Sequence, residues 1–261
     1  MKKISALSFT LSAVALPLLA QTHDPLEPKP GSATAVVSSA VPRMADGKPD
    51  LTGVWDHPYV PDMSKSTKNG PLMSQEGPGK LPFTPAAQAA FDKYDPNTDG
   101  DYTGACLPFG YLRSFNAPYP IEIFQTPKQV AFLFEQSTWF HIAYLNRDHP
   151  KDVNPTWFGD SVARWDGDTL VIDTIGFNGK TRLDTLGHPH SDAMHVTQRL
   201  TRLDGQRLKM EITVDDPKTF SEPWKNTRVF ALMKPGSELM EYSCEENNRD
   251  LSQGHIKRPT E

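Results

Sequence analysis

The sequence predicts an all-β, antiparallel, barrel-like domain with one short helix, and three observations support this fold class. Many short segments combine apolar and polar residues in alternation, and most are bounded by Gly, Pro, Asp or Asn. Only one stretch has the residue pattern of a helix. No helical pattern separates the consecutive strands, whereas a parallel α/β sheet needs a crossover helix between them.

The expected strands follow a first part that is rich in loops. A structured start is expected at Arg43, where Asp46-Gly47 indicates a turn and residues 51–56 can begin a strand. Residues 57–82 are expected to be loops. The later strands are expected at residues 121–125, 129–135, 138–145, 161–165, 169–175, 193–203, 207–214, 227–234 and 239–244.

One helix is expected at residues 85–94. Thr84 is a good N-cap, and Pro85 suits the first helical position because its missing N–H would lack a helical partner anyway. The pair Asp95-Pro96 ends the helical pattern, since a residue before proline is disfavoured in helical geometry.

The second of two Asp-Gly hairpins can be given a register. A three-residue loop at 203–205, with Gly205 in the left-handed position, pairs Leu200 with Leu208 and separates an apolar face from a polar one. A strict two-residue loop would mix the two sets of side chains. This register places His195 on the polar face.

Composition and charge set limits on location and partners. The chain has 261 residues and a net charge of −5 without a basic run, so nucleic acid is a poor candidate partner. Residues 1–20 have the basic start, apolar stretch and small residues of a secretory signal peptide. No later apolar run is long enough for a membrane span. We therefore expect a periplasmic or secreted protein.

The chain is expected to divide into four parts: a signal peptide at 1–20, a flexible leader at 21–42, a single β-rich domain at 43–250 and a C-terminal tail at 251–261. The leader is rich in Pro, Ala, Ser and Thr, without a periodic pattern. The oligomeric state is left open.

The chain contains two cysteines, Cys106 and Cys244. In an oxidising compartment they can form one disulfide, and the alternative is two buried free thiols. A calcium loop at 95–106 is a weak candidate, because Cys106 stands where a bidentate Glu is needed, and a solvated acidic linker is the simpler interpretation.

The main candidate site is the segment 184–195, in which imidazoles and carboxylates gather. Imidazoles near carboxylates suit general acid–base catalysis or metal ligation, because the imidazole pKa lies near neutrality and a carboxylate can orient the ring. The alternative is a polar loop whose side chains stabilise turns. The titratable residues of the segment are Asp184, His188, His190, Asp192 and His195.

Each of these residues has an expected role. His195 is the candidate general base, with His190 beside it and Asp192 or Asp184 orienting one ring. If a divalent metal is bound, the candidate ligands are His188, His190 and His195. No P-loop, G-x-G-x-x-G or G-x-S-x-G motif is present, so no organic cofactor is expected.

Four further residues are candidates for binding a substrate. Arg199 shares the polar face of the hairpin with His195 and could hold a substrate carboxylate or stabilise an oxyanion. Glu122 stands between Ile121 and Ile123 and could point into a cavity or simply at water, and Tyr119 shortly before it is a third candidate. His141 is a fourth candidate, although a histidine that alternates with Trp139 on a strand is more often part of the core.

Several long strings together resemble a large group of secreted, mostly uncharacterised bacterial proteins. The strings are DGKPDLTGVW at 46–55, WDGDTLVIDTIGFN at 165–178 and GHPHSDAMHV at 187–196. The resemblance covers nearly all of the chain after residue 20. It implies a signal peptide, a β-rich domain and a shared polar site, but no particular reaction. The strand spacing is also faintly similar to lipocalin-like barrels, by analogy only.

Two classes of function are compatible with these observations. The first is a secreted enzyme that acts on a small polar or aromatic molecule by His/Asp acid–base chemistry, with or without a metal, in a hydrolysis, elimination or isomerisation. The second is a non-catalytic, lipocalin-like protein that binds a small molecule. The gathering of titratable groups favours the enzyme, because a simple binding barrel would need aromatic residues there instead.

Overall fold

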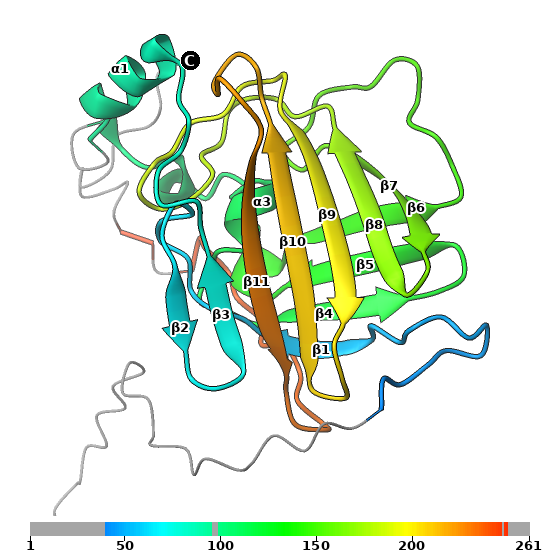
Figure 1. Ribbon diagram of the computed structural model, residues 1–261. Helices are drawn as coiled ribbons and strands as arrows, with labels where there is room; N and C mark the ends of the chain where they lie inside the picture. Colours follow the sequence, from blue (N-terminus) through cyan, green and yellow to red (C-terminus); the bar gives the residue numbers. More distant parts are fainter. Residues whose placement is uncertain (1–39, 96–98, 247, 250–261) are drawn as a thin grey trace, which may run out of the picture. The chain divides into compact units, whose positions relative to one another are not determined.

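A computed structural model describes residues 40–95, 99–246 and 248–249. Within this part nine strands form a closed β-barrel. Figure 1 shows how the strands curve around a common interior. The predicted all-β barrel is therefore confirmed. The predicted signal peptide, most of the predicted leader and the predicted C-terminal tail lie outside the described residues.

The barrel strands are β1 (Gly53–Asp56), β4 (Ile121–Gln125), β5 (Gln129–Phe134), β6 (Phe140–Leu145), β7 (Asp160–Asp166), β8 (Thr169–Ile175), β9 (His195–Arg202), β10 (Arg207–Asp215) and β11 (Trp224–Leu232). A small hairpin of β2 (Thr67–Asn69) and β3 (Met73–Glu76) adds to the outer edge of β11. This hairpin lies in the segment for which only loops were predicted.

The barrel closes between its first and last strands. Trp55 on β1 pairs with Ile121 on β4 and with Leu232 on β11. All neighbouring pairs are antiparallel except β6 and β7, which run parallel. The chain needs the long connection of residues 146–159 to return to the start of β7, as a parallel pair requires.

Two predicted strands, at 121–125 and 169–175, match the observed bounds, but the predicted strand at 239–244 is wrong. That segment has no strand pairing, and the Met240 N–H donates to the Glu135 carboxylate instead. The physical reason is that β11 already pairs with β10 on one side and with β1 and β3 on the other. A further strand therefore finds no free edge there.

Helix α1 (Pro85–Lys93) begins and ends as the sequence predicts. The Thr84 hydroxyl accepts a hydrogen bond from the Ala87 N–H at 3.3 Å, and Tyr94 is the C-cap. Its Phe91 ring packs against His188, with the ring centroids 4.7 Å apart. Aromatic packing of this kind fixes α1 to the loop that precedes β9.

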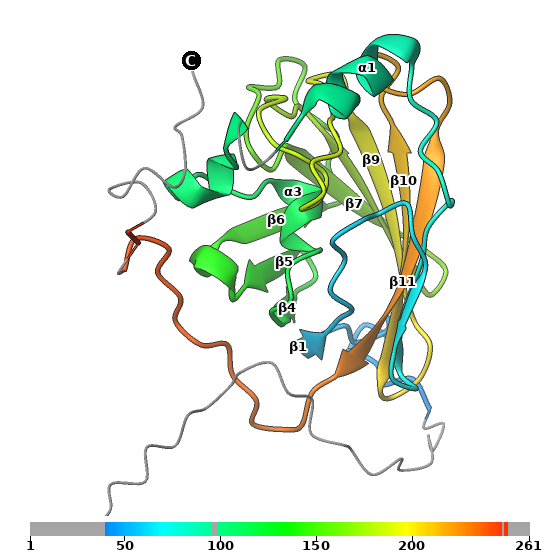
Figure 2. The same ribbon diagram turned by 90° about the vertical axis from the view of Figure 1, so that its left-hand side faces the viewer.

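A short helix, α3 (Tyr111–Ser114), was not predicted, and all four of its residues are buried. It lies between the two layers of strands in Figure 2. The Tyr111 hydroxyl donates to Gln198 on β9, and its ring lies 4.6 Å from that of His141 on β6. Helix α3 thus joins opposite sides of the barrel.

The β9–β10 hairpin separates its faces as predicted, but its register differs by two residues. Leu200 pairs with Met210 and not with Leu208. The Asp204 carboxylate stabilises the turn by accepting from the backbone N–H groups of Gln206 and Arg207 at 2.8 and 2.9 Å. Gly205 does not have a positive φ, because this capped turn does not require one. A shift of two keeps every side chain on its predicted face.

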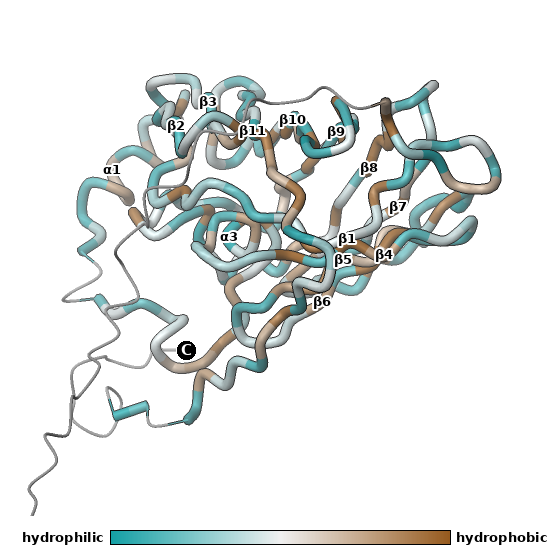
Figure 3. Tube along the Cα trace, turned by 90° about the horizontal axis from the view of Figure 1, so that it is seen from below, coloured by the Kyte–Doolittle hydropathy of each residue, from teal (hydrophilic) through white to brown (hydrophobic). Residues whose placement is uncertain are grey.

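Large apolar side chains fill the interior of the barrel. Trp55, Phe132, Phe230 and Met210 have no exposed surface. In Figure 3 hydrophobic and hydrophilic positions alternate along the strands, as expected when one face of a sheet is buried. The polar face of β9, including His195, consequently lies on the outside of the barrel.

Cys106 and Cys244 form a disulfide, with Cα atoms 5.6 Å apart. The bridge resolves the alternative of two free thiols, and it is compatible with an oxidising compartment. Cys244 lies beyond β11, so the bridge fastens the segment after the last strand to the turn at residues 102–106. Within the described residues, no helix has the length and apolar character needed to cross a bilayer.

Candidate functional site

Three strands present an acidic and histidine-rich patch on the outer face of the barrel. Asp160 begins β7, Asp173 lies on β8 and His195 begins β9. Each alternates with an inward, buried neighbour, so all three side chains point away from the core. His195 Nε2 lies 2.7 Å from Asp173 Oδ2, which makes a carboxylate–imidazole pair.

A second imidazole connects the two carboxylates. His149, from the connection between β6 and β7, places Nδ1 2.8 Å from Asp160 Oδ1 and Nε2 2.9 Å from Asp173 Oδ1. Arg147 forms an ion pair with the other oxygen of Asp160. The result is a continuous chain of contacts, the outer-face relay: Arg147, Asp160, His149, Asp173 and His195.

Asp173 is held in its ionised form. Partial burial alone would raise its pKa, but hydrogen bonds from His195 and His149 and their charges outweigh that effect and lower the pKa. Both Asp173 oxygens therefore accept from imidazoles. A carboxylate fixed in this way can orient each ring and stabilise a positive charge that develops on it.

His195 is the accessible end of the relay. Its side chain is 42% exposed, compared with 18% for His149 and 26% for Asp173. Within the described part of the chain, Nδ1 of His195 has no hydrogen-bond partner. This nitrogen is free to exchange a proton with a molecule that arrives from solvent.

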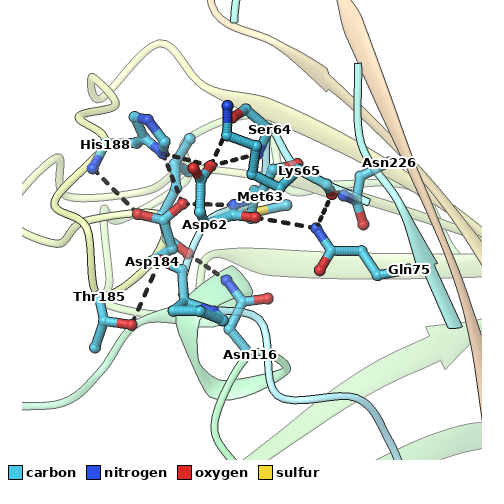
Figure 4. A network of polar contacts seen from close by, with 12 residues as sticks. Asp62, Met63, Ser64, Lys65, Gln75, Asn116, Asp184, Thr185, His188 and Asn226 are labelled. Carbon is cyan, nitrogen blue, oxygen red and sulfur yellow. Dashed lines mark hydrogen bonds and ion pairs between the residues drawn. The ribbon is translucent and has the colours of Figure 1, made fainter. Parts of the chain in front are cut away.

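A second group of possible functional residues, Asp62, Asp184 and His188, lies close together in Figure 4, and the His188 ring packs against Phe91 of α1. His188 Nδ1 lies 2.6 Å from Asp184 Oδ2 and 3.9 Å from Asp62 Oδ1. Asp184 also accepts from the Met63 N–H at 2.8 Å, and Asp62 accepts from the N–H and hydroxyl of Ser64. The Met63–Asp184 hydrogen bond and the His188–Asp62 contact join the loop before β2 to the loop after β8.

The donor atoms of Asp62, Asp184 and His188 lie within 4.8 Å of one another, so this group could hold a metal ion. Carboxylate and imidazole donors suit several divalent cations. Of the metal ligands predicted from the sequence, only His188 belongs to the group. His190 and His195 do not join it, because His190 contacts Thr181 and His195 contacts Asp173.

His190 and Asp192 also lie apart from the relay contacts. His190 is buried, with Nε2 2.6 Å from the Thr181 hydroxyl and Nδ1 2.9 Å from the Ser191 carbonyl, and burial lowers its pKa. Asp192 is exposed and pairs with Lys218 at 2.6 Å. The carboxylate that contacts His195 is Asp173, while the predicted alternatives Asp184 and Asp192 bind elsewhere.

The predicted substrate-binding residues are dispersed. Arg199 is outside on β9 but pairs with Asp166, and it is four residues from His195, roughly 13 Å along an extended strand. His141 is buried against the Ser161 hydroxyl, and burial lowers its pKa to about 3, which fits the interpretation as a core residue. Glu122 lies on β4, and partial burial raises its pKa. Tyr119 packs against Tyr242.

The weak calcium candidate has a different explanation. Asp101 caps the short turn at Tyr102–Ala105 by accepting from the Thr103 N–H, and it forms an ion pair with Arg113. Residues 96–98 of this segment lie outside the described residues. The described carboxylate therefore stabilises a turn and a buried cation.

Sequence reasoning missed His149, Asp160 and Asp173. The available signal was alternation: Asp173 interrupts the apolar β8 at an outward position, and Asp160 stands at the same kind of position on β7. The partner His149 could not be placed, because it lies on a loop. Asp62 was missed for the same reason.

No family model and no curated protein matches this sequence. The fold and the site define the protein as a closed, mixed β-barrel with a filled interior. It carries an Asp–His relay on its outer face and a buried Asp–His group beside its helix.

Proposed function

We propose that this protein is a secreted enzyme that transfers protons at His195 and acts on a small polar molecule from solvent. The observation that carries the proposal is the contact of His195 Nε2 with Asp173 Oδ2 at 2.7 Å, in a ring that stays 42% exposed. Structural ion pairs of this kind do not need an open imidazole edge, whereas a general base does.

The geometry gives each atom a role. The Nε2–H of His195 donates to Asp173, so the lone pair lies on Nδ1, the free nitrogen. Nδ1 takes a proton from water or from an acidic C–H or O–H group of the substrate, and the carboxylate stabilises the imidazolium that forms. The proton then returns to the leaving group or to the product. This cycle suits hydrolysis, elimination or isomerisation.

The rest of the relay keeps Asp173 charged and in place. His149 occupies the second oxygen of Asp173, and Asp160 with Arg147 holds the far side of His149. A cleft of about 260 Å³ opens beside Arg147, between the residues after β6 and the outer face of β7. Arg164, in the lining of this cleft, offers a cation to a polar group of a small molecule, and Arg147 connects the cleft to the relay through its ion pair with Asp160.

The test is hydrolysis of p-nitrophenyl acetate by the protein and by His195→Gln. We expect the variant to lose about a hundredfold in rate, as for other general bases. Lys209→Gln is the matched control, because Lys209 also lies on the outer face, pairs with the carboxylate of Glu211 and is 32% exposed. Equal rates for the protein and His195→Gln, including absence of turnover by both, would contradict the proposal.

A metal-assisted reaction at the buried group is a second candidate, favoured by the convergence of three donor atoms within 4.8 Å. There Asp62, Asp184 and His188 would hold the cation. Metal analysis of the purified protein and of His188→Ala tests it. One equivalent of metal in the first and none in the second is expected.

We also propose that the chain is exported and that its mature form begins near Gln21. The basic and apolar start supports a cleaved signal peptide, and the disulfide fits the same destination. Mass spectrometry of the protein from its native cell should show a chain that lacks residues 1–20. A chain that retains Met1 would contradict export by this route.

A further inference from the structure

A cationic cleft of about 490 Å³ lies between the end of α1 and the loop after β8. Three positive side chains line it: Lys93 at the end of α1, and Lys180 and Arg182 on the loop. Among the described residues, Asp99 is the one carboxylate in the lining. The local balance is therefore positive in a chain whose net charge is −5.

The three cations are not neutralised by the described part of the protein. No ion pair joins Lys93, Lys180 or Arg182 to a carboxylate within the described residues. The Asp99 carboxylate accepts a hydrogen bond from the Asp95 N–H at 2.9 Å, so one of its oxygens already has a partner in its own loop. Uncompensated cations around a concave surface raise the local concentration of anions.

Arg182 is positioned before any ligand arrives. Its guanidinium stacks over the Tyr94 ring, 4.4 Å from the centroid, and its backbone N–H donates to the Tyr102 hydroxyl at 3.2 Å. The Tyr102 hydroxyl in turn donates to the Phe109 carbonyl at 2.7 Å. Stacking immobilises the guanidinium plane and leaves its N–H edge available, which is the geometry for a planar, two-point contact with an oxyanion.

The Tyr94 ring is itself fixed by the loop. A Cβ atom on Gly187 would lie 2.1 Å from Tyr94 Cε1, so the ring rests directly on the glycine backbone. The close contact explains why this position carries no side chain. Tyr94 supports Arg182 at the wall of the cleft.

We propose that this cleft binds the dianionic phosphate group of a small molecule or inorganic phosphate. Three cations against one carboxylate leave about two positive charges, which suit a phosphate that carries about −1.5 to −2 at neutral pH. A monocarboxylate would leave one charge unbalanced. None of the lining residues belongs to the outer-face relay, so this site is independent of the proposed catalysis.

Isothermal titration calorimetry of the full chain with inorganic phosphate, phenyl phosphate and acetate tests the proposal. We expect saturable binding of both phosphates at one site with a Kd below about 1 mM, and weaker binding of acetate. Added KCl should weaken the binding by screening. Tighter binding of phenyl phosphate than of inorganic phosphate would identify an organic phosphate as the ligand, and the reverse order would identify the free ion.

Two variants assign the binding to the cleft. Lys180→Gln should weaken phosphate binding about tenfold, and Arg182→Lys should weaken it similarly because lysine keeps the charge but loses the two-point contact. Lys225→Gln, an exposed cation on β11, is the control and should bind as the unmodified protein does. Circular dichroism establishes that each variant is folded.

Three results would overturn the proposal. The first is the absence of saturable phosphate binding up to about 10 mM. The second is equal affinity in the unmodified protein and in folded Lys180→Gln, and the third is tighter binding of acetate than of phosphate.

Discussion

The imidazole of His188 and the carboxylate of Asp184 form a buried pair, with Nδ1 2.6 Å from Oδ2 and side-chain exposures of 5% and 0%. This pair joins two loops that are more than a hundred residues apart, because the same carboxylate also accepts from the Met63 N–H. Removal of the Asp184 carboxylate should therefore lower the stability of the folded protein.

We predict that Asp184→Asn lowers the free energy of unfolding by about 3 kcal/mol, the usual cost of breaking a buried, hydrogen-bonded pair. Urea denaturation measures the change. Asp192→Asn is the control, since its pair with Lys218 is 61% exposed on both sides and solvent screens it, so the variant should unfold at nearly the same urea concentration as the unmodified protein. Similar small losses in the two variants would show that the buried pair is not a major source of stability.

The second prediction concerns the dependence of stability on pH. His57 is buried with its Nδ1–H directed at the Pro58 carbonyl and its Nε2 without a hydrogen-bond partner among the described residues. Burial lowers the pKa of His57 from 6.5 to about 4. The unfolded chain therefore binds this proton more readily, and the stability from His57 is complete above pH 6.5 and is lost as the pH falls toward 4.

For His57 alone the loss amounts to about 3 kcal/mol over that interval. His57→Phe keeps a ring beside Phe230 and should flatten the decline of the unfolding free energy between pH 7 and pH 4. Urea titrations at several pH values provide the measurement. An unchanged slope in the variant would assign the decline to other groups, such as His141, whose pKa burial also lowers.

The third prediction uses two glycines with similar backbone angles. Gly187 has φ +92°, and a side chain there would collide with the Tyr94 ring. Gly47 has φ +82°, and a Cβ atom there would have no other atom within 4 Å. Gly47→Ala should cost about 1 kcal/mol from the backbone strain alone. Gly187→Ala should cost about 2 kcal/mol more, because the methyl group displaces the Tyr94 ring. Thermal unfolding measures both, and equal losses would show that the ring moves without penalty.

The fourth prediction concerns the disulfide. Cys106 and Cys244 are 138 residues apart in the chain, and closing such a loop contributes up to about 5 kcal/mol in the chain-entropy model. The double variant Cys106→Ser/Cys244→Ser should therefore unfold at lower urea concentration while retaining the β-sheet circular dichroism spectrum, because neither cysteine lies in a barrel strand. Loss of the sheet signal in native buffer would show that the barrel itself depends on the bridge.

The fold was predictable where local chemistry determines it. Thr84 and Pro85 define the start of α1, and the alternating residues of β9 and β10 define which face is buried. The exact register was not predictable from this pattern, because shifts by two residues conserve the faces. The carboxylate cap of Asp204 decides between them.

The site was only partly predictable because its contacts are distant in sequence. The importance of His195 follows from its place on a polar face, but its partner Asp173 lies 22 residues earlier on another strand. His149 reaches the relay from a loop that a parallel strand pair makes necessary, and the sequence pattern predicts antiparallel pairing only. The histidines of 184–195 are close in sequence, but in the fold His188, His190 and His195 contact three different partners, Asp184, Thr181 and Asp173.

The pairing of Trp55 with Leu232 has a consequence for the order of events during synthesis. A ribosome releases β1 long before β11, so the growing chain cannot complete the barrel until its last strand has emerged. Until then β1 and β10 expose open backbone edges to other chains. Contacts between such remote segments also slow folding. A chain without β11 therefore keeps two open sheet edges, and this incomplete state is the one that a chaperone would protect best.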